Sequence, residues 1–115
     1  MNINLLYFNA RSLYPKLHTL KAECIVHKLH IVYITETWLD DNVTNSEICI
    51  PGFDIVRFDR NRHGGGVIIY VSSLFTYNIL FTGDPSFECI ITSLKLNSCN
   101  FVFVYCIDPL MHQMC

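Results

Sequence analysis

The sequence lacks the features that mark membrane proteins, secreted proteins and disordered chains. It contains no apolar run approaching the ~18 residues needed to span a bilayer. Its first residues lack a basic segment and a small-residue cleavage site, so they do not resemble a signal peptide. With 51% hydrophobic residues, the chain is too apolar to stay disordered. We therefore expect an intracellular protein, cytoplasmic or nuclear, that has no membrane partner.

The six cysteines include no C-x-x-C pair, and their irregular spacing lacks the framework of a zinc ribbon or a disulfide scaffold. We expect buried or free thiols. A zinc site made from Cys24, His27 and His30 is disfavoured, because His30 lies only partly on the same helical face and a fourth ligand is missing. The net charge of −2 argues against general electrostatic binding of nucleic acid, but not against an enzyme that grips phosphate locally through a metal ion.

The order of the predicted elements indicates an α/β fold. Apolar runs at residues 3–8 and 31–35 predict two buried strands. Between them, a helix is predicted from an N-cap at Ser12 to about His30. Strand, helix and strand at this spacing predict a βαβ unit with parallel strands. The helix is predicted from apolar residues that recur near helical spacing: Leu13, Leu17, Leu20, Cys24 and Leu29.

The rest of the chain is patterned for strands. Residues 54–59 and 67–71 predict a hairpin around a turn at residues 60–66, whose three glycines supply positive φ angles. Residues 77–81 predict a weaker strand, and residues 88–96 and 101–105 predict a further pair around residues 97–98. These successive hairpins predict a mostly antiparallel sheet that follows the βαβ unit. The alternation is lost at residues 106–115, so we expect a domain over residues 1–105 and a divergent tail over residues 106–115.

Polar side chains follow the two predicted parallel strands. Asn9 follows the first strand and Glu36 follows the second. These two strands are predicted to be neighbours in one βαβ unit, so we expect the two residues to lie close together. In open α/β sheets, ligands bind outside the carboxyl ends of strands. A carboxylate suits Mg²⁺, and an amide N–H can hold a phosphate oxygen. The alternative is a turn asparagine and a solvated loop acid.

Five short segments carry a resemblance to a known family. In chain order they are Asn9-Ala10-Arg11-Ser12-Leu13, Glu36-Thr37-Trp38-Leu39, Pro51-Gly52-Phe53, Arg57-Phe58-Asp59-Arg60 and Arg62-His63-Gly64-Gly65-Gly66-Val67. The series is similar to the opening half of the endonuclease/exonuclease/phosphatase domains, of the apurinic/apyrimidinic-endonuclease-like class, in non-LTR (LINE-type) retrotransposon polyproteins. The resemblance covers about residues 2–105, and it implies part of an αββα two-sheet sandwich.

The resemblance implies Mg²⁺-dependent hydrolysis of a phosphodiester in DNA, with no small-molecule cofactor. By resemblance, Asn9 would contact the phosphate, Glu36 would bind Mg²⁺, and Tyr105 would stand near the scissile phosphate. Trp38, beside Glu36, is expected to pack rather than to stack on a base.

A local basic patch lies at the predicted hairpin. Arg57, Arg60 and Arg62 are candidate contacts to the DNA backbone, although a solvated turn with Asp59 nearby explains them almost as well. The neighbouring His-Gly-Gly-Gly segment imitates the oxyanion-hole sequence of lipases, but the chain lacks the G-x-S-x-G motif of their nucleophile.

The family pattern breaks after Tyr105, where the chain reads Cys106-Ile107-Asp108-Pro109 and not Arg-Pro-Pro. The later Gly-Asp-x-Asn and Ser-Asp-His segments are absent. Because hydrolysis needs a base to activate water as well as charge stabilisation on the phosphate, we predict a truncated endonuclease domain that is inactive alone. Two alternatives stay open: a non-catalytic nucleic-acid-binding or interaction remnant, and a phosphatase-type member of the same superfamily. The pattern does not indicate an oligomeric state.

Overall fold

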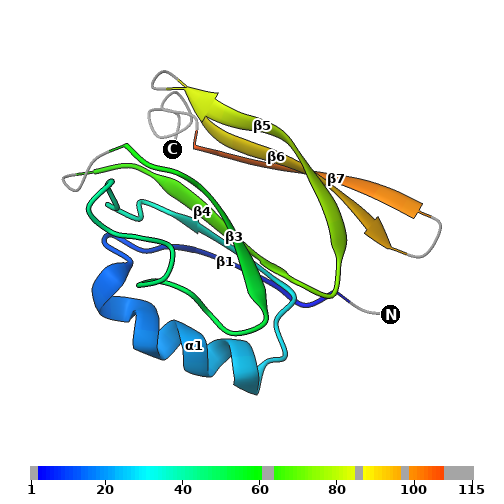
Figure 1. Cartoon of the computed structure of the whole chain (residues 1–115), viewed down its shortest axis with the longest axis horizontal. Coiled ribbons are helices and arrows are strands. Elements are labelled where there is room, and N and C mark those ends of the chain that lie inside the picture. Colours follow the sequence, from blue (N-terminus) through cyan, green and yellow to red (C-terminus); the bar gives the residue numbers. More distant parts are fainter. Residues whose placement is uncertain (1–2, 61–63, 85–86, 97–98, 108–115) are drawn as a thin grey trace.

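The computed structural model describes residues 3–60, 64–84, 87–96 and 99–107. These residues form three layers: a helix, a four-stranded sheet and a three-stranded sheet (Figure 1). The helix covers one face of the four-stranded sheet, and the three-stranded sheet packs on the other. The α/β class is confirmed, and the layers match the predicted part of an αββα sandwich. Among the described residues, no helix is long and apolar enough to cross a bilayer.

The first sheet has the strand order β1-β2-β4-β3. β1 (Leu5–Asn9) and β2 (Ile31–Thr35) run parallel, joined by the 3₁₀ turn η1 (Tyr14–Lys16) and the helix α1 (Leu17–Val26). The predicted βαβ unit is therefore confirmed. β3 (Phe53–Phe58) and β4 (Val67–Ser72) form the predicted antiparallel hairpin, and β4 also pairs with β2.

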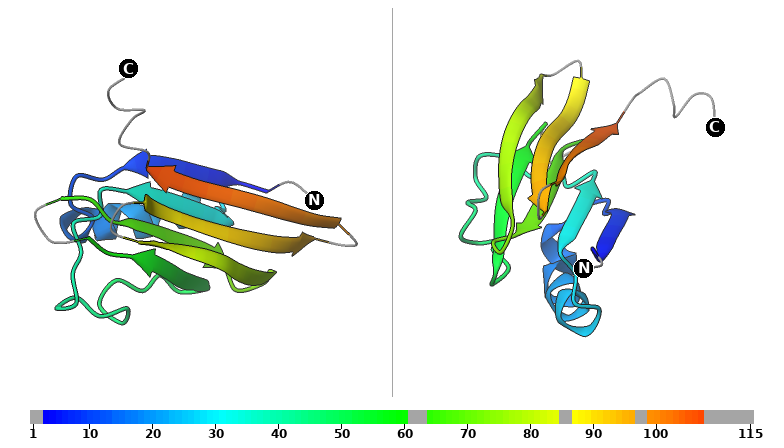
Figure 2. Two further views of the ribbon diagram at one scale, coloured as in Figure 1. Left: turned by 90° about the horizontal axis from the view of Figure 1, so that it is seen from above. Right: turned by 90° about the vertical axis from the view of Figure 1, so that its right-hand side faces the viewer.

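The second sheet is an antiparallel meander of β5 (Thr76–Asp84), β6 (Phe87–Leu96) and β7 (Cys99–Ile107). β7 continues to Ile107, past the strand end that the sequence predicts at Tyr105. Figure 2 shows β1 and β7 along one side of the sandwich and β3 and β5 along the other.

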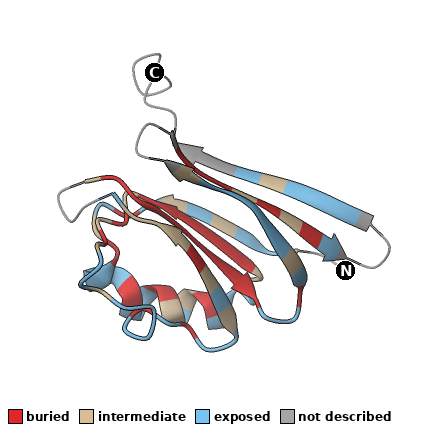
Figure 3. Ribbon diagram, turned by 45° about the horizontal axis from the view of Figure 1, so that its top comes forward, coloured by how far each residue is buried: buried red, intermediate tan, exposed pale blue. Residues whose placement is uncertain are grey.

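Alternation of side chains gives the first sheet two buried faces, so β2 and β4 are buried along their whole length (Figure 3). One core lies between α1 and the sheet, and the other lies between the two sheets. The helix-side core contains Leu13, Leu17, Leu20, Cys24, Val32, Ile34, Ile48, Ile68 and Tyr70, and the inter-sheet core contains Ile31, Tyr33, Val56, Val67, Ile69, Val71, Ile90 and Leu94.

The predicted start of the helix is wrong. Ser12 does not cap it: φ of Ser12 is +84°, the first turn is the 3₁₀ turn η1, and α1 ends before the predicted position. The physical reason is a set of tertiary hydrogen bonds. The backbone N–H groups of Ser12 and Leu13 donate to the carbonyl oxygens of Glu36 and Thr37, at 3.1 and 3.0 Å, and these bonds accompany the positive φ that keeps Ser12 out of a helical conformation.

The expectation of unpaired cysteines is correct for Cys24 and Cys49, which are free thiols. It is wrong for Cys89, which is disulfide-bonded. Spacing along the chain does not indicate this bond, because a disulfide depends on which strands become neighbours in space.

Candidate functional site

The carboxyl ends of β1 and β2 meet at one end of the first sheet. Asn9 is the last residue of β1 and pairs with Thr35, the residue before Glu36. Because the two strands are parallel, Asn9 and Glu36 leave the sheet at the same end, and the closeness of their side chains stays a prediction. Asn9 is exposed and Glu36 is partly exposed, so both side chains are open to solvent.

Backbone strain is concentrated at this end of the sheet. Within the described chain, five residues other than glycine have positive φ, and four of them lie here: Arg11 (+46°), Ser12 (+84°), Glu36 (+52°) and Trp38 (+55°). Each such residue costs about 1–2 kcal/mol and persists only where the surroundings enforce it. Strained backbone gathers at binding and catalytic sites, so this cluster marks the strand ends as the candidate site.

Hydrogen bonds between the two loops enforce this conformation. The backbone N–H of Ala10 donates to the carbonyl oxygen of Thr35 at 2.8 Å, and that of Ser12 donates to Glu36 at 3.1 Å. The Lys16 ammonium group donates to the carbonyl oxygen of Ala10. The loop after β1 is therefore tied directly to the loop that carries Glu36.

A third segment supports the Glu36 loop from the other side. The N–H groups of Thr37 and Trp38 donate to the carbonyl oxygens of Gly66 and Gly65, at 3.3 and 3.0 Å. Both glycines have positive φ, +67° at Gly65 and +91° at Gly66, which glycine adopts without a steric penalty. The glycine-rich segment thus serves as a backbone platform beneath Glu36. This role accounts for the glycines, so an oxyanion hole is not needed to explain them.

Glu88 is the residue of this region that the sequence reading missed. It lies near the start of β6, is 8% exposed, and its Oε1 accepts a hydrogen bond from the Gly66 N–H at 2.7 Å. The sequence did contain a signal. Glu88 is in register with Ile90, Thr92 and Leu94, which are all buried, so the alternation places an acid on an inward-facing position of the strand.

Tyr105 lies in β7, where its backbone pairs with that of Ile90. Two residues earlier on β6 is Glu88, which reaches the Gly66 platform. The backbone at Tyr105 is therefore at the same end of the molecule as the candidate site. Its side chain lies outside the described part of the chain, so its role near a phosphate stays a prediction.

The basic patch is only partly described. The Arg57 guanidinium donates to the Asp59 carboxylate at 3.0 and 2.7 Å, to Asn45 Oδ1 at 2.9 Å and to the Asp40 carbonyl oxygen at 3.1 Å. These bonds tie the β3 end to the preceding loop, so Arg57 has a structural role whatever else it binds. Arg60 is exposed, and Arg62 lies outside the described residues. Contact of these arginines with DNA stays a prediction.

The donors at the strand ends suit a hard cation. The described residues contain no group of three or more His, Cys, Asp or Glu side chains that could enclose a metal ion. Mg²⁺ does not require such a cage, because it keeps several waters and is commonly held by one or two carboxylates together with substrate phosphates. The Glu36 carboxylate and the Asn9 amide therefore fit Mg²⁺ better than they fit zinc.

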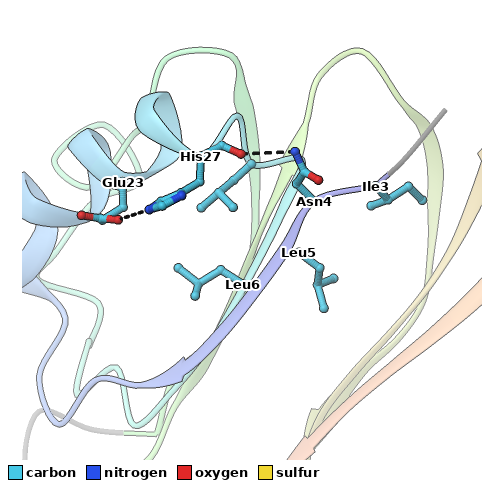
Figure 4. A pocket seen from close by; sticks show the side chains of 7 residues that line it. Ile3, Asn4, Leu5, Leu6, Glu23 and His27 are labelled. Carbon is cyan, nitrogen blue, oxygen red and sulfur yellow. Dashed lines mark hydrogen bonds and ion pairs between the residues drawn. The ribbon is translucent and has the colours of Figure 1, made fainter.

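A cavity of about 610 Å³ lies at the opposite end of β1 (Figure 4). Its polar groups are engaged with one another: His27 Nε2 lies 2.8 Å from Glu23 Oε2, and the Asn4 side-chain amide donates to the His27 carbonyl oxygen at 3.2 Å. These contacts fasten the end of α1 to the start of β1, so we assign the cavity no catalytic role. It is lined by Ile3, Asn4, Leu5, Leu6, Glu23, His27 and Leu29.

No family model matches the chain, and no curated protein matches it. Several solved structures share its fold, including two endonucleases. AP endonuclease LMAP from Leishmania major superposes with a TM-score of 0.72 at 16% identity, over 91% of this chain and 40% of that one. The chain has an AP-endonuclease-like fold. The endonuclease domain of TRAS1, a telomere-specific non-LTR retrotransposon, superposes with a TM-score of 0.61 at 13% identity, over 98% of this chain and 49% of that one.

At these identities the likeness establishes the fold, and it confirms the AP-endonuclease-like architecture that the sequence resemblance implies. The chain spans less than half the length of either solved structure.

Proposed function

We propose that this chain is the opening part of a metal-dependent DNA endonuclease domain of the retrotransposon type, and that it is inactive without the rest of such a domain. The observation that carries the proposal is that Asn9 and Glu36 leave the first sheet at the same end, where four residues hold strained backbone. The shared fold supports it, because one solved neighbour is an AP endonuclease and the other is the endonuclease domain of a non-LTR retrotransposon. The Glu-Thr-Trp-Leu and Arg-x-Gly-Gly-Gly-Val segments favour DNA over lipid phosphates as the substrate.

Each residue has a distinct part in the proposed site. Glu36 would hold Mg²⁺, and the Asn9 amide would donate to a non-bridging phosphate oxygen. The bound ion supplies positive charge that stabilises the developing charge on the phosphate. The Gly-Asp-x-Asn and Ser-Asp-His segments, which by resemblance would supply the groups that activate water, are absent from the sequence, and for this reason we expect binding without turnover.

Metal binding can be tested with the intact chain and a terbium ion, a luminescent hard cation that prefers oxygen ligands. Trp38 is the only tryptophan in the sequence and lies two residues from Glu36, so it is a built-in sensitiser. We expect terbium emission upon excitation of Trp38, competition by Mg²⁺, and loss of the signal in Glu36→Gln. A signal that Glu36→Gln leaves unchanged would contradict the proposed site.

A further inference from the structure

Glu88 connects the second sheet to the loop that carries Glu36. Its carboxylate, on β6, accepts a hydrogen bond from Gly66 N–H at 2.7 Å. The carbonyl oxygen of Gly66 accepts from Thr37 N–H, and that of Gly65 accepts from Trp38 N–H. Thr37 and Trp38 immediately follow Glu36. A continuous path of hydrogen bonds therefore runs from a side chain of one sheet to the candidate metal ligand on the other.

Packing alone does not explain an acid at this position. Burying a carboxylate is unfavourable, and an apolar side chain of similar volume stabilises a core as well or better. The equivalent inward positions further along β6 are occupied by Ile90 and Leu94, which are apolar and fully buried, and by the neutral residue Thr92. At this position the chain instead has Glu88, whose side chain is long enough for its carboxylate to accept a hydrogen bond from the Gly66 N–H and so to orient the peptide between Gly65 and Gly66.

We infer that Glu88 is a positioning residue that acts through the Gly65–Gly66 peptides to hold Glu36 in its strained, ligand-binding conformation. The inference rests on the proposed function, because it assigns the geometry of the same metal site. What Glu88 contributes is reach and an acceptor oxygen, not a direct bond to the metal. Glutamine at this position preserves both properties, whereas aspartate keeps the charge but is too short.

The test is terbium binding sensitised by Trp38, measured on the full chain. We expect Glu88→Gln to bind terbium like the wild type, and Glu88→Asp to bind about tenfold more weakly, the effect of one lost hydrogen bond. Glu23→Asp, the same change at a partly exposed acid beside His27, is the matched control and should not alter the affinity.

Each outcome decides a separate point. The inference is overturned if Glu88→Asp binds terbium with the affinity of the wild type. It is also overturned if Glu88→Gln and Glu88→Asp weaken terbium binding equally, because the affinity would then depend on the negative charge that Glu88→Gln removes. If the wild type gives no sensitised signal, the proposed function fails and the role of Glu88 fails with it. If Glu88→Asp does not fold, amide hydrogen exchange of the Glu88→Gln variant is measured instead. We expect the Thr37 and Trp38 amides to exchange slowly in this variant, as in the wild type. Fast exchange of these two amides in Glu88→Gln would overturn the inference.

Discussion

The hydroxyl group of Tyr70 on β4 donates a hydrogen bond to the backbone carbonyl oxygen of Ile48 at 2.8 Å. Both residues are fully buried, in the core between α1 and the first sheet. Ile48 belongs to the long connection between β2 and β3, which contains no regular element. This buried bond therefore helps to fasten the connection to the sheet that carries the candidate site, together with the bonds of Arg57 to Asn45 and Asp40.

Removing the hydroxyl group should destabilise the fold. We predict that Tyr70→Phe lowers the free energy of unfolding by about 1–2 kcal/mol, because the Ile48 carbonyl would stay buried without a partner. Urea denaturation measures the change. Tyr14→Phe, at a side chain that is 51% exposed, is the control and should change little. Equal urea midpoints for both variants would show that the buried bond contributes nothing.

Alkaline pH should weaken the fold through the same residue. Burial raises the pKa of Tyr70 above its ordinary value, and burial also raises the pKa of the Cys24 thiol in the same core. The folded state thus keeps a proton that the unfolded chain loses. The contribution of Tyr70 is fully present below the ordinary tyrosine pKa of about 10 and falls above it, by about 1.4 kcal/mol per pH unit, whereas the contribution of Cys24 begins to fall at the lower ordinary pKa of a thiol. Thermal melts should show this loss, and Tyr70→Phe should reduce it.

The purified chain should not nick DNA by itself. We predict no conversion of supercoiled plasmid in Mg²⁺ above the background of a Glu36→Gln sample prepared in parallel. The reason is the absence of the Gly-Asp-x-Asn and Ser-Asp-His segments, without which nothing is assigned to activate water. Nicking by the wild type that disappears in Glu36→Gln would show that the chain is catalytically sufficient.

The fold was largely predictable because its signals are local and repeated. Five β-branched or aromatic residues from Ile31 to Thr35 suffice to predict β2 with its observed bounds. The helix face was predicted from Leu17, Leu20 and Cys24, which are buried. The start of the helix was missed because it depends on hydrogen bonds to a segment more than twenty residues away, and these override the capping preference of Ser12.

Of the candidate site, only the residues proposed to contact the ligand directly could be predicted from the sequence. Asn9 and Glu36 could be identified because each directly follows an apolar strand, and parallel neighbours end at the same edge. Glu88 could not be connected with them, because its contact with Gly66 joins two sheets whose packing the sequence pattern does not specify. The strained φ angles at Glu36 and Trp38 carry no sequence signal either, since neither residue type favours them.

The platform beneath Glu36 should tolerate no side chain at Gly66. A Cβ atom there would overlap the hydroxyl oxygen of Thr37, and φ is +91°. Gly52 is a matched control, because its φ is +85° but a Cβ atom would meet nothing within 4 Å. We predict that Gly52→Ala costs about 1 kcal/mol from strain alone, and that Gly66→Ala costs about 1–3 kcal/mol more from overpacking. Chemical denaturation of the two variants measures the difference, and equal losses would mean that Thr37 moves aside freely.

The last prediction concerns where the folded part of the chain ends. β7 pairs with β6 along the whole span from Cys99 to Ile107, and its Phe103 packs against the inter-sheet core. A chain that ends at Leu96 would leave the edge of β6 without a hydrogen-bonded neighbour. It would also expose part of the Ile90 and Leu94 side chains to solvent.

Partial burial of Phe103 alone is worth roughly 1–2 kcal/mol, and the strand pairing is lost in addition. We therefore predict that a chain ending at Ile107 resists limited proteolysis like the full-length chain, whereas a chain ending at Leu96 is degraded rapidly. A chain ending at Tyr105, the boundary that the sequence predicts, should be intermediate, because it removes the last two residues of β7. If the chain ending at Ile107 were cleaved as fast as the one ending at Leu96, residues 108–115 would be needed for folding and our boundary would be wrong.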